Sequence, residues 1–317
     1  MKERYLFVDN LRGLLILIVV LGHCLQYTGC NIQENVLYNA IQSFQMPLFM
    51  FASGFVSTKD SYSWEWLVKR HKRLLIPFVV GTFIMSLTFR EGSMLEYFLY
   101  PLKGLWFLWV LAILSFAQFF ISLLSAKWNN EQKGFFVCTL FVFLVVSLLS
   151  YVFKSLLCFD LIAFHFMFYF TGYYFNRFWP TIKNSTPKGL VVLSFLLSVF
   201  LSLSFNKNVP DYFFIKNFSV YVRVVSFIIT ISFFVMSWVC IDKKSRILNY
   251  IGNNTLGIYL IHRVLFEFRP NSMESWLLDG YYPLGIIIIF ILMAGISLLL
   301  VELFSKNKIM SFIFLGK

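Results

Sequence analysis

The stretch "LFVDNLRGLLILIVVLGHCLQYTG" (residues 6–29) is apolar enough to enter a lipid bilayer, yet it contains Asp9, Arg12 and His23. A charged side chain near the centre of a bilayer costs at least about 2.5–3.5 kcal/mol. A helix that served only as an anchor would not need these residues. Their presence therefore indicates a membrane helix whose polar side chains have a purpose inside the protein.

The composition extends the membrane prediction to the whole chain. Of its 317 residues, 59% are hydrophobic, 20% are aromatic and only 13% are charged, and 40 are phenylalanine. A soluble domain of this size does not bury so many apolar side chains, so we predict a polytopic integral membrane protein. The net charge of +12 does not indicate a nucleic-acid partner, because the basic residues lie in short connections between apolar runs.

The chain contains ten apolar segments, each close to the length of a membrane-spanning helix. Long apolar runs that alternate with short connections exclude a β-barrel, whose strands alternate apolar and polar residues. We therefore predict an all-α bundle of about ten transmembrane helices. The segments are 6–27, 36–57, 74–89, 105–125, 134–153, 156–176, 189–205, 218–241, 250–268 and 281–304.

The distribution of basic residues predicts the orientation of the bundle. With the N-terminus in the cytoplasm, 18 of the 27 Lys and Arg residues fall in cytoplasmic connections, six in outer connections and three within the segments. By the positive-inside rule, both termini are cytoplasmic. We expect residues 1–317 to form a single membrane domain without a cleaved signal peptide or an appended soluble domain. The five cysteines have no paired spacing, so we expect neither a disulfide framework nor a metal site.

Two polar residues of the first helix lie on one face. Arg12 and His23 are eleven residues apart, which is three turns plus about 20°, so their side chains are about 16 Å apart along the same face. Asp9 precedes Arg12 by three residues and is placed to pair with it. The alternative is an arginine that extends to the membrane surface and a histidine that bonds a neighbouring helix.

The first helix resembles the opening signature of the membrane-bound acyltransferase 3 family, in which an arginine is followed by ten residues and then a histidine. Four other stretches resemble motifs of that family, in the same order, so that the resemblance covers nearly the whole chain. They are "FQMPLFMFASGF" (44–55), "KRHKRLLIPF" (69–78), "LWFLWVL" (105–111) and "LNYIGNNTLGIYLIH" (248–262).

This resemblance implies an O-acyltransferase that moves an acyl group, usually acetyl, from cytoplasmic acyl-CoA to a hydroxyl of a sugar or glycan. The expected donor is acetyl-CoA, with no metal, and the expected acceptor is a cell-envelope or exported saccharide. The resemblance also implies a multi-pass protein of a bacterial inner membrane, surrounded by lipid and associated with envelope polysaccharide assembly.

The residues of the first helix suit this chemistry. Transfer to a hydroxyl needs a base, and the ordinary pKa of histidine suits that role near neutral pH, so His23 is the candidate general base. An acyl-imidazole intermediate is the alternative. Arg12 is expected to hold the phosphate or pantetheine part of the donor, or to orient the site through Asp9. Cys24 points about 100° away from His23, and we interpret it as structural.

Two arginines before the third segment are candidates for donor binding. Arg70 and Arg73 are one helical turn apart, and guanidinium groups match phosphate geometry. The similar Arg-x-x-Arg pattern of the family is thought to serve the donor. The alternative is that the cluster only sets topology, which we favour for Lys69 and Lys72.

The ninth segment carries His262 and Arg263, with Glu267 one turn further on. Three such residues are costly in lipid and must face protein or water. We expect His262 and Arg263 to bind the acceptor or to orient the base, and the alternative is a polar clasp between helices.

Other polar and aromatic residues have simpler interpretations. Asp160 and His165 are read as a polar pair at an interface or in the core. Trp106 and Trp109 fit an interfacial belt better than a sugar-stacking platform. We interpret Arg223 and Glu302 as packing residues and His71 as solvated.

Three other functions remain open at this point. A secondary transporter or flippase of an envelope precursor would also need buried arginine and histidine, but the prolines lie near helix ends and offer little support for broken helices. A noncatalytic partner in polysaccharide assembly would leave the polar face of the first helix unexplained. Within the family, an N-acyltransferase differs only in its acceptor.

Overall fold

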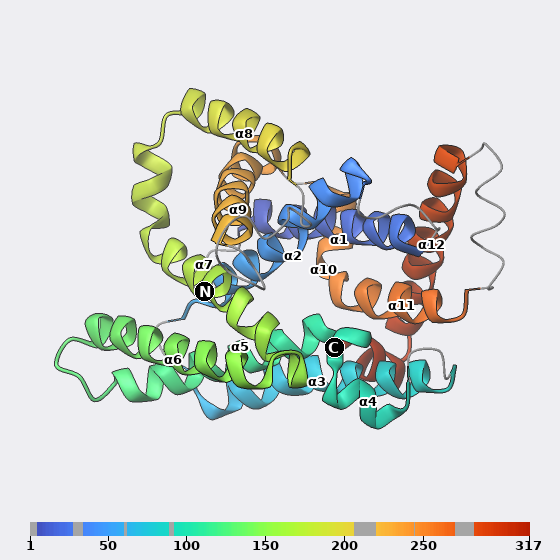
Figure 1. Ribbon diagram of the computed structural model, residues 1–317, viewed down its shortest axis with the longest axis horizontal. Coiled ribbons are helices and arrows are strands. Elements are labelled where there is room, and N and C mark those ends of the chain that lie inside the picture. Colours follow the sequence, from blue (N-terminus) through green and yellow to red (C-terminus); the bar gives the residue numbers. More distant parts are fainter. Residues whose placement is uncertain are drawn as a thin grey trace.

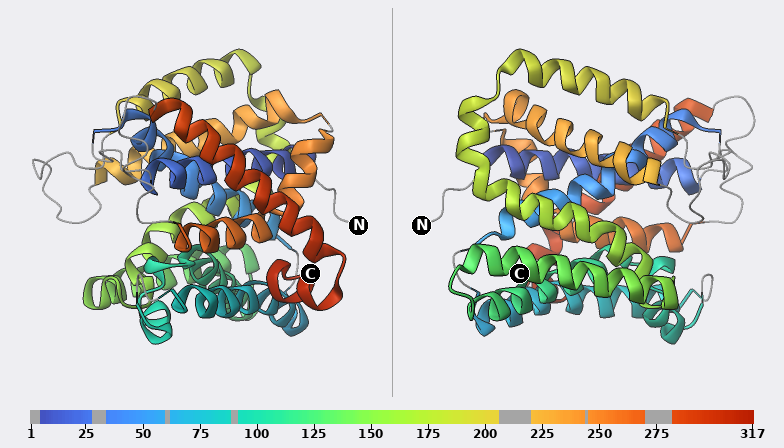
Figure 2. Two further views of the ribbon diagram at one scale, coloured as in Figure 1. Left: turned by 90° about the vertical axis from the view of Figure 1, so that its right-hand side faces the viewer. Right: turned by 60° about the vertical axis from the view of Figure 1, so that its left-hand side comes forward.

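The structure is a computed structural model that describes residues 5–27, 34–59, 62–88, 92–205, 220–243, 245–269 and 282–317. Within these ranges the chain is helical and contains no strand, which confirms the predicted all-α membrane bundle. Figure 2 shows that the long helices cross one another at various angles and pack into one bundle. The elements are α1 (Leu6–Tyr27), α2 (Val36–Ser57), α3 (Trp64–Ser86), α4 (Met94–Leu99), η1 (Pro101–Lys103), α5 (Trp106–Ser125), α6 (Glu131–Phe153), η2 (Leu156–Cys158), α7 (Phe159–Ser185), α8 (Lys188–Leu203), α9 (Val220–Ile241), α10 (Arg246–Asn253), α11 (Thr255–Glu267), α12 (Tyr282–Ser305), α13 (Lys308–Met310) and η5 (Ser311–Leu315).

Six helices of the described chain are long and apolar enough to cross a membrane: α1, α5, α6, α7, α9 and α12. All ten predicted apolar segments fall on helices where they are described, but α2 and α3 carry many polar or charged residues, and α8 and α11 are only 16 and 13 residues long. The structure therefore supports a multi-pass membrane protein, and ten crossings stay a prediction.

The apolar surface of the bundle is suited to lipid. Only 17% of the apolar window of α6 and 22% of that of α12 are buried inside the protein. Their exposed side chains are large and apolar, such as Phe141 and Leu148 on α6 and Ile291 on α12. An apolar surface of this extent is unfavourable in water, so these faces are expected to contact lipid tails.

Two helix crossings depend on pairs of glycines. A Cβ atom on Gly54 of α2 would overlap the backbone carbonyl of Tyr169 on α7, and one on Gly172 of α7 would overlap the carbonyl of Phe51. The first helix crosses α10 in the same way, with Gly13 against the carbonyl of Leu248 and Gly252 against that of Asp9. Small residues let helix backbones approach closely, which is a main source of packing energy between membrane helices.

The predicted ninth helix (250–268) is in fact two helices, α10 and α11, which meet at Asn254. The backbone of Asn254 has φ −108° and ψ 10°, which is not helical. Its side-chain Nδ2 donates to the carbonyl of Tyr250 at 2.9 Å and so stabilises the break. An asparagine competes with the helix for backbone partners, which explains the interruption. The break places Thr255 at the start of α11, facing α1.

The asparagine that follows Asp9 has a structural role. Asn10 is fully buried, and its side-chain Nδ2 donates to the carbonyls of Ile241 at 2.8 Å and Lys243 at 2.9 Å. The last carbonyls of a helix have no partner within the helix, so Asn10 caps the end of α9 from α1. The cap fixes the position of α1 in the bundle.

Replacing Asn10 with alanine should lower the free energy of unfolding by about 1–3 kcal/mol, because the two carbonyls at the end of α9 lose their donor. The measurement is the midpoint of unfolding of the purified protein in a titration with denaturing detergent. Asn184→Ala, at an exposed position of α7, is the matched control and should leave the midpoint unchanged. Equal midpoints for the two variants would contradict the capping role.

Candidate active site

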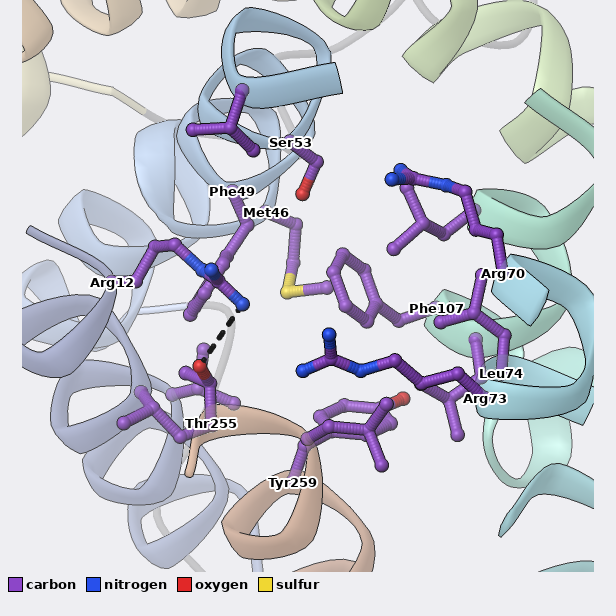
Figure 3. Close-up of a pocket in the computed structure, with 16 residues that line it drawn as sticks. Arg12, Met46, Phe49, Ser53, Arg70, Arg73, Leu74, Phe107, Thr255 and Tyr259 are labelled. Carbon is purple, nitrogen blue, oxygen red and sulfur yellow. Dashed lines mark hydrogen bonds between the residues drawn. The ribbon is translucent and has the colours of Figure 1, made fainter. Parts of the chain in front are cut away.

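Three arginines point into one cavity, which we call the arginine cavity. It has a volume of about 160 Å³ and is lined by residues of α1, α2, α3, α5 and α11. Figure 3 shows Arg12 reaching into it from one wall, and Arg70 and Arg73 from the opposite wall. None of the described residues that line it is acidic. The three arginines therefore concentrate positive charge in the cavity, and this charge attracts an anion.

Neutral groups hold two of these guanidiniums. Arg12 Nη2 donates to Thr255 Oγ1 at 3.3 Å, and Arg70 Nε donates to Ser115 Oγ at 2.6 Å. The Arg70 guanidinium also lies over the ring of Trp66, with its Cζ 5.5 Å from the ring centroid. Arg73 follows one turn after Arg70 and is exposed within the open cavity. A guanidinium has five N–H groups, so Arg70 and Arg73 keep donors for a ligand.

A second cavity, which we call the histidine cavity, has a volume of about 280 Å³ and contains His23. Its wall is a mixture of aromatic, amide and apolar side chains from α1, α2, α5, α7, α9 and α11. The Nδ1 atom of His23 lies 3.1 Å from Oε1 of Gln26. An amide oxygen only accepts, so this bond places the proton on Nδ1 and leaves the lone pair of Nε2 available.

A second histidine lies beside the first. The rings of His23 and His262 have their centroids 5.3 Å apart. His262 is fully buried, and its Nδ1 donates to the carbonyl of Ile258 at 2.7 Å. Within the described residues, its Nε2 has no hydrogen-bond partner. The two imidazoles are thus adjacent at the wall of the histidine cavity.

Arg263 lines the histidine cavity but is also bound by the protein. Its Nη1 is 2.6 Å from Oε1 of the fully buried Glu267, and its Nη2 donates to the carbonyl of Lys103 at 2.8 Å. Its guanidinium also lies over the ring of Tyr27, at 5.4 Å from the centroid. These contacts join α11 to η1 and α1, as a polar clasp would, which is the alternative that the sequence left open for Arg263.

The two cavities meet end to end inside the bundle. Val19, Met46 and Tyr259 line both of them. Because α1 is unbroken from Leu6 to Tyr27, it carries Arg12 into one cavity and His23 into the other. The sequence predicted a shared face for these two residues, and this face follows the axis that joins the cavities.

A comparison with protein families adds to this geometry. A family model described as an acyltransferase domain, that of the acyltransferase 3 family, matches residues 5–302. The chain belongs to this family. The matched residues extend from the start of α1 into the last turn of α12 and include every residue that lines either cavity. Searches among curated proteins and among solved structures gave no significant match.

The acyltransferase places its predicted residues in two groups. Arg12, Arg70 and Arg73 converge on the arginine cavity, whereas His23 and Arg263 line the histidine cavity with His262 beside them. The seventh, Asp9, lines neither cavity. It is buried one turn before Arg12, where its backbone carbonyl packs against Gly252.

For three other residues the structure shows contacts that the sequence did not predict. Trp106 stacks on His165, with ring centroids 5.2 Å apart and an interplanar angle of 20°, and both residues line the histidine cavity. Trp109 donates its Nε1–H to the carbonyl of Leu157 at 3.0 Å. Asp160, which was grouped with His165 as polar residues of an interface or the core, accepts from the backbone N–H of Leu161.

Gln26 and Thr255 were missed altogether. Gln26 is three residues after His23, a spacing that places two helical side chains within reach of each other and could have revealed it. Thr255 reaches Arg12 only through tertiary structure, so the sequence carried no signal for that contact.

Proposed function

We propose that this membrane acyltransferase is an O-acyltransferase that transfers an acetyl group from cytoplasmic acetyl-CoA to a hydroxyl of a cell-envelope or exported saccharide. The observation that carries the proposal is the end-to-end arrangement of the two cavities. One concentrates positive charge, the other contains a histidine with an available lone pair, and Val19, Met46 and Tyr259 line both of them.

The arginine cavity is the proposed donor site. Coenzyme A carries a pyrophosphate and a 3′-phosphate, and three converging guanidiniums are suited to such groups. The first turns of α1 contact α10, which leads into Asn254, and Lys317 donates to that same asparagine, so both ends of the described chain lie at the end of the bundle that holds this cavity. The excess of basic residues predicts that this end is cytoplasmic, where acyl-CoA is made available.

The proposed reaction takes place where the cavities meet. The Nε2 atom of His23 accepts the proton of the acceptor hydroxyl as its oxygen attacks the thioester carbonyl carbon. The carbon–sulfur bond then breaks, and the leaving thiolate of coenzyme A takes up the proton from the imidazolium. Gln26 keeps the ring in the required tautomer through Nδ1.

The acceptor is proposed to bind in the histidine cavity. Its wall offers amide groups that pair with sugar hydroxyls and aromatic rings that stack on sugar faces. Gln42, Gln45, Tyr38 and Trp106 are among these groups. An N-acyltransferase would use the same cavity with an amine, so the product decides between the two. The multi-pass bundle is proposed to lie in a bacterial inner membrane, next to envelope polysaccharide assembly.

The proposal is tested by mass spectrometry of envelope glycans from cells with and without the gene. The expected result is a mass difference of one acetyl group per modified sugar. When membranes receive acetyl-CoA labelled in its acetyl group, the label should be recovered on the glycan. A label found on an amine would favour the N-acyltransferase. Substrate that crosses vesicle membranes without any acyl donor would instead favour a transporter.

Replacing Arg73 with glutamine should raise KM for acetyl-CoA by about 10-fold or more, because a hydrogen bond between charged groups contributes about 1.5–3 kcal/mol. The neighbouring Lys72→Gln removes the same charge from an exposed position that lines neither cavity. It should leave KM nearly unchanged. If the two substitutions changed KM equally, the positive charge of Arg73 would act on the orientation of the chain in the membrane and not on the donor.

A further inference from the structure

The C-terminal segment, residues 311–317, folds back against the end of the bundle that holds the arginine cavity. Leu315 is fully buried and packs against Gly257 of α11. The backbone of Gly316 adopts φ +63°, and a Cβ atom there would overlap the carbonyl of Arg73. Figure 1 places the C-terminus beside α3, in agreement with this contact. The segment is therefore seated next to a residue of the donor cavity.

The last residue of this segment bonds a residue that is adjacent to the cavity wall. Lys317 Nζ donates to Asn254 Oδ1 at 2.6 Å. Asn254 directly precedes Thr255, the hydroxyl partner of Arg12. Lys317 thus connects the Arg73 side of the cavity to the Arg12 side, while its own side chain remains exposed to solvent.

The surroundings of Lys317 suit an anion. Its ammonium donates to a neutral amide, and two of its three N–H groups remain for another acceptor. Partial burial of the ammonium and the nearby Arg73 guanidinium lower the pKa of Lys317. A phosphate between these two cations would remove the repulsion that lowers it.

The length of coenzyme A explains why a further cation is useful. Its thiol and its nucleotide are at opposite ends of an extended molecule, so the two ends cannot both lie beside the same residues. If the thioester points towards His23, the nucleotide lies at the rim, where its phosphates reach the C-terminal segment.

We infer that Lys317 is a further phosphate-binding residue of the donor site, which the folded C-terminal segment holds at the rim beside Arg73. The inference rests on the proposed function in one respect, that the donor is a coenzyme A thioester. The groups that Lys317 binds are the phosphates of the coenzyme A nucleotide.

The test measures binding of coenzyme A, and of pantetheine, which lacks all of its phosphates, to the purified protein by calorimetry. Lys317→Gln should weaken coenzyme A binding by about 5- to 10-fold, with no effect on pantetheine, and Lys317→Arg should restore it. Lys308→Gln removes the same charge from an exposed site nearby and should have no effect. Equal coenzyme A affinity in the wild type and Lys317→Gln would overturn the inference. Because binding is measured without an acceptor, Lys317-dependent binding would support it even if no acetyl transfer to a saccharide were found.

Discussion

Replacing His23 with alanine should lower the rate of acyl transfer by about 10²–10⁴-fold and leave coenzyme A binding intact. The large loss is expected because a positioned general base contributes a factor of this size. Binding should survive because His23 lines the histidine cavity, whereas the three arginines line the other one. The measurement is the initial rate of acetyl transfer by purified protein, together with the dissociation constant of coenzyme A.

His71→Ala is the matched control for this substitution. His71 is a partly exposed histidine of α3 whose Nδ1 bonds the carbonyl of Leu67, and it lines neither cavity. It should transfer acetyl groups at the wild-type rate. A His23→Ala variant as active as His71→Ala would remove His23 from the mechanism. Acetyl label that stays on wild-type protein in the absence of acceptor, but not on His23→Ala, would favour the acyl-imidazole route over the general base.

The parts of the site that could be predicted from the sequence are those set by one helix. The 100° turn per residue fixed the shared face of Arg12 and His23, and one turn of helix placed Arg70 beside Arg73. Both relations hold in the structure because α1 and α3 are unbroken over these residues. These arginine and histidine side chains face internal cavities, as expected because such polar groups are costly in lipid.

The parts that could not be predicted depend on residues far apart in the chain. Thr255 is 243 residues from its partner Arg12, and Asn10 is 231 residues from the carbonyl of Ile241. Their contacts follow from how α1 crosses α10 and α9, which no local pattern encodes. The stacking of Trp106 on His165 is of the same kind: a tryptophan at the start of a membrane helix suggests a position among the headgroups, and its contact with His165 follows from the packing of α5 against α7.

Replacing Gly54 with leucine should prevent the bundle from packing, at a cost of about 3 kcal/mol or more. A Cβ atom on Gly54 would overlap the backbone carbonyl of Tyr169, and a backbone cannot move aside as a flexible side chain does. The reciprocal contact of Gly172 with the carbonyl of Phe51 gives Gly172→Leu the same expectation. The helices α2 and α7 would have to separate, which exposes the small residues and carbonyls between them.

The matched control is Gly295→Leu on α12. Gly295 is also within a long helix, but a Cβ atom there meets nothing within 4 Å and the position is exposed. Leucine is the better helix former by about 0.8 kcal/mol, so this variant should be as stable as the wild type or more so. The measurement is the yield of monodisperse protein in mild detergent and its midpoint of unfolding. Because α2 contributes Met46 and α7 contributes His165 to the wall of the histidine cavity, any Gly54→Leu protein that folds should also have lost acyl transfer. A Gly54→Leu variant that matches Gly295→Leu in both yield and midpoint would show that the backbones of α2 and α7 do not approach as closely as the structure has them.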